Sequence, residues 1–127
     1  LMPERPVWGL ANDDLHRLGH LGHAFSIFPL EQHSTAAFRT AMENGAYYFS
    51  HGETAPRIHE IRHDSERHLL TIFSDYPEDT VWISNGRIIH RGPSIAYREP
   101  GKIGSYLRAE IRSDSGTTFT NPFGVYR

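Results

Sequence analysis

The chain opens with an apolar run at residues 7–11 that ends abruptly in polar residues. A short apolar run bounded in this way is typical of a buried strand. Asp13, Asp14 and His16 follow it, so the predicted strand delivers two carboxylates and an imidazole at its C-terminal end. Many α/β enzymes present their metal ligands in this way, at the ends of buried strands.

One helix is predicted next, after a short extended piece at residues 25–30. Its apolar positions recur at helical spacing on one face, and they are Ala37, Phe38, Ala41 and Met42. Either Ser34 or Thr35 can cap its first turn, because both hydroxyls can accept from free backbone N–H groups. Gly45 can end the helix in the left-handed conformation, and residues 46–50 return to strand character.

After residue 52 the pattern changes to short strands and tight turns, so we expect a boundary between residues 52 and 53. The strands predicted beyond it cover residues 58–61, 68–73, 81–84, 87–91, 105–112 and 117–126. Asn85-Gly86 predicts a two-residue hairpin, since both positions of a type I′ turn need a positive φ. Asp114-Ser115-Gly116 predicts a second hairpin.

Residues 106–112 alternate between apolar and charged side chains, which indicates a half-buried antiparallel strand. Leu107, Ala109 and Ile111 share one face of it. Strands at this spacing predict a small antiparallel β-sandwich over residues 53–127. Asn121-Pro122 does not fit the middle of a central strand, because proline has no N–H to donate, so we expect an edge or a bulge there.

Composition narrows the range of functions. The chain has 127 residues, enough for one domain or for one small domain and part of another. A formal net charge of -2 gives no reason to expect binding to nucleic acid or to an anionic membrane. No apolar run approaches the ~20 residues that span a bilayer, and the start has no apolar signal core, so we expect a soluble chain of undetermined compartment. The absence of cysteine excludes disulfides and thiolate metal sites.

Three histidines lie close together at positions 16, 20 and 23. Gly19 and Gly22 argue against a regular helix that would stack them, so we expect His20 and His23 to be solvated in a glycine-rich loop. Asp14 and His16 are the predicted metal ligands. A carboxylate with an imidazole suits zinc, manganese or iron better than calcium. For Asp13 we expect a structural role, with its carboxylate capping the turn after the strand.

Taken in order, these features resemble the C-terminal part of the PHP family, the polymerase and histidinol phosphatase superfamily of metal-dependent hydrolases. The features are the Asp-Asp-x-His that follows a strand, the capped helix, the run at residues 45–52, and a β unit that closes through residues 106–108, 114–116 and 120–123. The resemblance is to the branch that carries a β-sandwich after the barrel. His51 stands where a small hydroxyl residue is expected, and we assign it no role.

The resemblance implies that residues 1–52 are the last strand, loop and helix of an α/β barrel, followed by the sandwich. It also implies a metal cluster whose ligands come from an early His-x-His, further histidines, an acidic residue and a final Asp-x-His. Only the last is present here, as Asp14 and His16. The implied chemistry is hydrolysis of a small-molecule substrate by metal-activated water, first of all a phosphoester and otherwise an ester or amide.

A catalytic metal site typically takes about three or more ligands from the protein, whereas this chain supplies two. We therefore expect this chain to be inactive alone, and to need the missing N-terminal barrel segment as its partner.

A non-catalytic binding or interaction module is the alternative, and exposed aromatic side chains would be its signature. The candidates are Tyr76, Trp82, Tyr97 and Tyr126. Of these, we expect Trp82 in the core.

Overall fold

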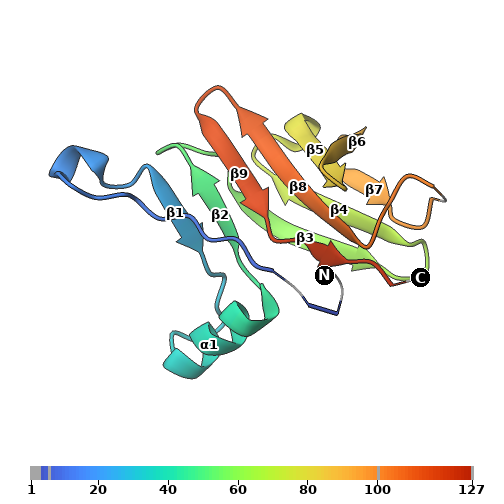
Figure 1. Ribbon diagram of the computed structural model, residues 1–127, viewed down its shortest axis with the longest axis horizontal. Coiled ribbons are helices and arrows are strands. Elements are labelled where there is room, and N and C mark those ends of the chain that lie inside the picture. Colours follow the sequence, from blue (N-terminus) through green and yellow to red (C-terminus); the bar gives the residue numbers. More distant parts are fainter. Residues whose placement is uncertain (1–3, 6, 100, 127) are drawn as a thin grey trace.

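Two antiparallel sheets lie face to face in the computed structural model, which describes residues 4–5, 7–99 and 101–126 (Figure 1). This part of the chain is mostly β, with one α-helix, α1 (Thr35–Asn44), and two 3₁₀ turns, η1 (Leu18–His20) and η2 (Pro77–Asp79). The larger sheet has the strand order β1 (Ala24–Ile27), β2 (Tyr48–His51), β9 (Gly116–Thr120), β8 (Tyr106–Ser113), β5 (Thr80–Ser84) and β6 (Arg87–Arg91), and β10 (Phe123–Gly124) also pairs with β8. The smaller sheet has the order β3 (Ile58–Asp64), β4 (Leu69–Ser74) and β7 (Ser94–Ala96).

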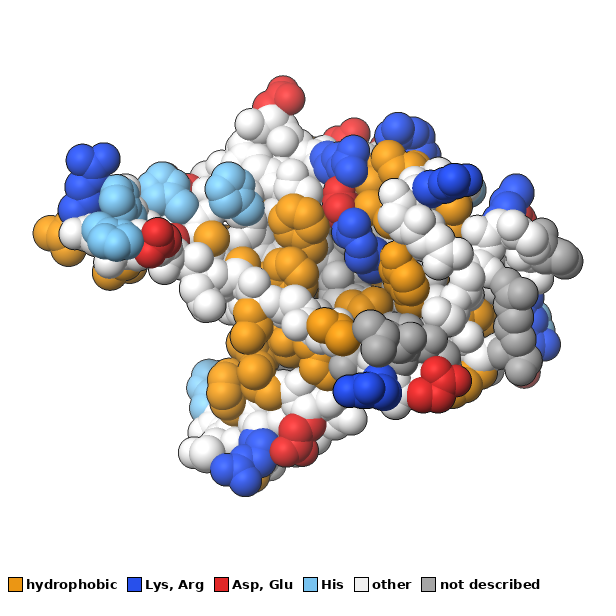
Figure 2. Space-filling model, viewed as in Figure 1, with side chains coloured by type: hydrophobic (Ala, Val, Ile, Leu, Met, Phe, Trp, Pro, Cys, Tyr) orange, Lys and Arg blue, Asp and Glu red, His pale blue; other side chains and the backbone are white. Residues whose placement is uncertain are grey.

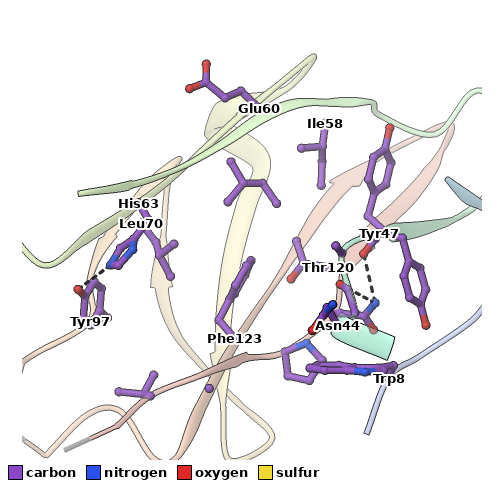
Figure 3. Close-up of a pocket in the computed structure, with 18 of the residues that line it drawn as sticks. Trp8, Asn44, Tyr47, Ile58, Glu60, His63, Leu70, Tyr97, Thr120 and Phe123 are labelled. Atoms are coloured by element: carbon purple, nitrogen blue, oxygen red, sulfur yellow. Dashed lines mark hydrogen bonds between the residues drawn. The ribbon is translucent and has the colours of Figure 1, made fainter. Parts of the chain in front are cut away.

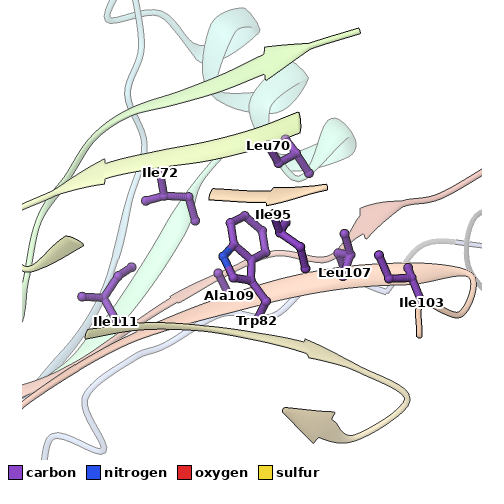
Figure 4. Close-up of a cluster of buried hydrophobic side chains, with 8 residues drawn as sticks. All are labelled: Leu70, Ile72, Trp82, Ile95, Ile103, Leu107, Ala109 and Ile111. Carbon is purple, nitrogen blue, oxygen red and sulfur yellow. The ribbon is translucent and has the colours of Figure 1, made fainter. Parts of the chain in front are cut away.

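The hydrophobic core lies between the sheets and centres on Trp82 of β5 (Figure 4). Trp82 is fully buried, and its indole N–H donates to the carbonyl of Gly92 at 2.9 Å, so burial leaves no unpaired donor. Buried aliphatic side chains from both sheets complete the core, and they are Leu70, Ile72, Ile95, Ile103, Leu107, Ala109 and Ile111. The prediction of a core position for Trp82 is confirmed, and the fold is of a small β-sandwich type.

Strand β8 shows the predicted alternation on its inner face and a departure from it on the outer face. Its three inward side chains are fully buried, and they are Leu107, Ala109 and Ile111. On the outer face Glu110 is buried as well, because Arg108 and Arg112 each donate to its carboxylate at 2.6 Å. Burial raises the pKa of Glu110, but these two hydrogen bonds outweigh burial and lower it.

Both predicted hairpins are present. Asn85 (φ 49°) and Gly86 (φ 72°) form the turn between β5 and β6, with the two positive φ values of a type I′ turn. The β8–β9 hairpin closes with Ser113 opposite Gly116. The strand expected at residues 117–126 is divided at Asn121-Pro122 into β9 and β10, and both pieces pair with β8. Strand β7 was not predicted.

The predicted helix is confirmed, and Ser34 is its cap, since its hydroxyl oxygen accepts from the N–H of Ala37 at 3.1 Å. Gly45 ends it in the left-handed conformation (φ 65°). A Cβ on Gly45 would lie 2.7 Å from the ring of Trp8, so glycine is needed both for the turn and for this close approach. No helix in the described ranges is long and apolar enough to cross a membrane.

The prediction of a buried strand at residues 7–11 is wrong. This segment runs beside β1 but forms no ladder with it. Side chains make the contacts instead. Ser26 of β1 bonds both the N–H and the carbonyl of Ala11 at 3.1 Å, and the N–H of Gly9 donates to Asn121 at 2.8 Å. Val7 and Leu10 are largely exposed, whereas Trp8, Gly9 and Ala11 are half-buried, so the run is covered only in part.

The expected boundary at residues 52 and 53 falls between β2 and β3. The larger sheet continues across it, because β2 pairs with β9 over residues 48–51 and β1 pairs with β2. The assignment of residues 1–52 to a barrel of a longer protein stays a prediction.

Replacement of Gly86 by valine should lower the free energy of unfolding by more than about 1 kcal/mol, because a β-branched residue tolerates positive φ poorly. A Cβ at this position meets nothing within 4 Å, so the loss would come from the backbone alone. Urea unfolding of the purified chain measures it. Gly86→Asn is the control, since asparagine adopts this conformation more readily. An unchanged stability for Gly86→Val would contradict the turn assignment.

Candidate functional site

Asp14 and His16 lie in the loop that joins the first extended segment to β1. This loop carries η1 at one tip of the molecule (Figure 1). Both side chains point to solvent, with 96% of Asp14 and 71% of His16 exposed. Histidine side chains gather at this tip in the space-filling view (Figure 2). The structure thus leaves the two predicted ligands accessible and close together.

The His16 ring is oriented by the backbone of Asp14. Its Nδ1 lies 3.0 Å from the Asp14 carbonyl oxygen and 3.4 Å from the Asp14 carboxylate oxygen Oδ1. A carbonyl oxygen only accepts, so this hydrogen bond places the proton on Nδ1 and leaves the lone pair on Nε2. Histidines that bind metals typically donate their other N–H in this manner. The pair therefore has the donor chemistry that a divalent transition metal takes.

His23 is exposed, as expected, and His20 is half-buried; both also make hydrogen bonds within the loop. His20 Nε2 accepts from Arg17 Nε at 2.8 Å, and its Nδ1 lies 3.3 Å from the Asp14 carbonyl oxygen. His23 Nε2 lies 3.0 Å from the carbonyl of Gly19. Among the described residues there is no group of three or more histidine, aspartate or glutamate side chains placed to hold a metal ion.

Asp13 has a structural role, as expected, but its carboxylate binds the end of the loop and not the turn directly after residues 7–11. Its carboxylate accepts from the backbone N–H groups of Gly22 at 2.5 Å, His23 at 2.8 Å and Ala24 at 2.7 Å. These hydrogen bonds, that from Gly22 first, hold the pKa of Asp13 below its ordinary value. Asp13 thus ties the end of the loop to its beginning. His51, the last residue of β2, is exposed beside Ala24, and the fold assigns it no chemical role.

A groove of about 860 Å³ opens between β3 and the segments that follow α1 and β9 (Figure 3). The inner face of β3 is covered only in part there: Ile58 packs against the core, whereas Ile61 is 40% exposed. Trp8, Ile58 and Phe123 are among its apolar lining residues. At one end His63 Nε2 lies 2.8 Å from the hydroxyl of Tyr97.

Sequence reasoning identified two residues of this groove without locating the groove. Tyr97 and Tyr126 were named as candidate binding aromatics, and both line it. Of the other two candidate aromatics, Tyr76 is exposed outside the groove lining and Trp82 is in the core. The groove itself depends on how the small sheet sits over the large one, which no local pattern encodes.

This chain should bind zinc weakly, because the described residues offer two ligands where a stable site takes about three or four. Titration with Zn²⁺, followed through the His16 imidazole resonances, measures it, with His20→Ala/His23→Ala as the control for loop histidines. Submicromolar binding that persists in this double variant and is lost in Asp14→Asn would show a complete site and contradict the two-ligand interpretation.

Comparison of the chain with protein-family models, with curated proteins and with solved structures gives no match. The resemblance to PHP proteins therefore rests on the residues of the chain itself and stays a prediction.

Proposed function

We propose that this chain is the C-terminal part of a PHP-like metal-dependent hydrolase, first of all a phosphoesterase, in which Asp14 and His16 supply two of the metal ligands. The observation that carries the proposal is that both side chains are exposed in one loop. Nδ1 of His16 is engaged by the Asp14 backbone, which leaves Nε2 as a nitrogen donor, and the Asp14 carboxylate is exposed beside Nδ1.

Exposed apolar side chains in the N-terminal part of the chain support a partner there. Among the described residues of the first 38 positions, the exposed large hydrophobic ones are Leu15, Leu18 and Leu21 in the loop, and Val7, Leu10 and Phe38 outside it. Exposed apolar surface of this kind usually marks an interaction site. A preceding barrel segment would cover these residues and bring the further ligands that Asp14 and His16 lack.

Each of the two side chains has a distinct task in the proposed site. Asp14 contributes negative charge, which offsets the charge of a dication, and neutral His16 contributes a nitrogen donor. A bound zinc, manganese or iron ion would lower the pKa of its water and polarise the scissile phosphoryl or carbonyl group. Without the other ligands we expect no hydrolysis by this chain alone.

A binding module is the second candidate, and the groove between the sheets favours it. Its size lies within the range of about 300–1,000 Å³ typical of small-molecule sites, and it combines aromatic walls with a few polar groups. In this alternative the sandwich contacts a ligand through the groove, and the loop at residues 14–21 has no chemical task.

In a longer chain that includes the preceding segment, Asp14→Asn and His16→Ala should each lose most of the metal-dependent hydrolysis while the fold stays intact. Asparagine keeps the shape of Asp14 and loses its charge, whereas alanine removes a nitrogen donor. The assay is hydrolysis of an aryl phosphate and an aryl ester with added Mn²⁺ or Zn²⁺, with bound metal counted for each variant. His23→Ala is the control and should retain turnover. Full metal content and full turnover in Asp14→Asn would contradict the proposal.

The groove can be tested separately with an apolar fluorescent probe, anilinonaphthalene sulfonate, and a matched pair of variants. Ile61→Glu places a charge in the groove, and Ile88→Glu places one at a similarly exposed position (41% against 40%) outside its lining. If the groove binds apolar ligands, probe fluorescence falls in Ile61→Glu only. Equal fluorescence in both variants would argue against the module.

A further inference from the structure

The groove between β3 and the segments that follow α1 and β9 is apolar along most of its length. Figure 3 shows Trp8 at one end of it and Tyr97 at the other, with Ile58 and Phe123 between them. Ile61 also lines the groove and is 40% exposed, so apolar surface is in contact with water here. A molecule that enters the groove would remove this surface from water, which is favourable. The groove therefore fits a ligand with an apolar body.

The charge that is left without a partner at the groove is positive. Among the described lining residues, the side chains with a full charge are Glu60 and Arg98. Both carboxylate oxygens of Glu60 accept from Arg62, at 3.0 and 3.1 Å, so this negative charge is compensated. Arg98 is exposed, and no carboxylate of the described residues forms an ion pair with it. An anion at this end of the groove would therefore meet a cation whose partner is otherwise water.

Tyr97 provides a hydrogen-bonding group next to Arg98. Its hydroxyl lies 2.8 Å from His63 Nε2, and Figure 3 shows this pair at the end of the groove opposite Trp8. A hydroxyl has one hydrogen and two lone pairs. When His63 donates from Nε2 to the Tyr97 oxygen, the hydroxyl hydrogen is free to donate to a ligand. Two donors in sequence then serve one acceptor, an arrangement in which each hydrogen bond strengthens the other.

The fold fixes the position of the Tyr97 hydroxyl before any ligand binds. The ring of Tyr97 packs against the hydrophobic core. Its backbone N–H donates to the carbonyl of His68 at 2.9 Å, at the end of the β3–β4 hairpin. A group that is already ordered costs little conformational entropy on binding, so its hydrogen bond contributes more to affinity.

We infer that the groove binds a small amphiphilic anion, whose apolar body lies along Ile58, Ile61 and Phe123 and whose anionic group meets Arg98 and the Tyr97 hydroxyl. This inference rests on the binding-module candidate, which it deepens by naming the class of ligand, and it does not depend on the proposed metal site. A neutral ligand of the same shape would leave Arg98 without an anionic partner, and a cationic one would be repelled by it.

The first measurement uses this chain and three probes that share one alkyl chain length: octanoate, 1-octanol and octylammonium. Isothermal titration at neutral pH gives the affinity of each. Octanoate should bind about three- to tenfold more tightly than 1-octanol, the range between an exposed ion pair and a hydrogen bond to a charged group. Octylammonium should bind most weakly. Equal affinities for octanoate and 1-octanol would overturn the inference.

The second measurement uses variants at the polar end of the groove with matched controls outside its lining. Arg98→Gln should weaken octanoate binding about three- to tenfold, whereas Arg87→Gln removes the same charge from an exposed position in β6 and should leave it unchanged. Tyr97→Phe should likewise weaken octanoate binding, and Tyr76→Phe should not. Affinity for 1-octanol should stay the same in all four variants, because its binding depends on the apolar lining. Equal loss of both probes in Arg98→Gln would indicate damage to the fold and contradict a role for its charge.

The outcomes separate this inference from the functions proposed above. If 1-octanol and octanoate bind equally and Ile61→Glu weakens both, the binding module stands and the anionic class of ligand is wrong. If neither probe binds and Ile61→Glu leaves the fluorescence of anilinonaphthalene sulfonate unchanged, the binding module fails and this inference fails with it. Unchanged octanoate affinity in Arg98→Gln would overturn the inference even where the groove binds apolar molecules.

Discussion

The burial of Trp82 between two sheets is the constraint on which the structure depends. The indole contributes more buried apolar area than any other side chain of this core, and large aromatic residues dominate core energetics. Its ring fills the space between β5, which carries it, and the inward side chains of β4 and β7. The N–H is satisfied by Gly92, so the ring gains its full burial without a polar penalty. β8 is then placed by its ladder to β5, and β9 by its ladder to β8.

A second constraint attaches the first quarter of the chain to this sandwich. Asn121 is buried at the break between β9 and β10, and its side chain bonds three backbone groups. Its oxygen accepts from the N–H of Gly9, and its nitrogen donates to the carbonyls of Gly45 and Tyr47. Asn121, which interrupts the last strand, thus holds together three parts of the chain: the N-terminal segment, the end of α1 and the start of β2. The loop with Asp14 and His16 extends from a segment anchored in this way.

Local signals in the sequence predicted the parts of the fold that local chemistry decides. The Asn85-Gly86 turn, the Ser34 cap, the Gly45 stop and the alternation in β8 depend on residues near one another in the chain, and all are present. The segment at residues 7–11 failed because an apolar run indicates burial but not a partner, and here the neighbouring strand bonds it through Ser26 alone. Glu110 was expected to face solvent, whereas two arginines from its own strand cover it. For the candidate site, the sequence named Asp14 and His16 and a structural role for Asp13, but not the residues that Asp13 binds. The groove and the ring orientation of His16 depend on tertiary placement, which residue types do not encode.

The order of strands in the larger sheet has a consequence for how the chain folds. On the side of β2 that faces the middle of the larger sheet, the neighbouring strand is distant in sequence. Its ladder is to β9, which lies more than 60 residues later, and β1 is attached through β2. Contacts between distant segments form late, because closing a long loop costs conformational entropy before the contact contributes any stabilisation. The hairpins β5–β6 and β8–β9 involve only neighbouring residues, so they form first and provide the edge to which β2 adds. We therefore expect β1 and β2, which come earlier in the chain, to join the sheet only after β9 has paired with β8.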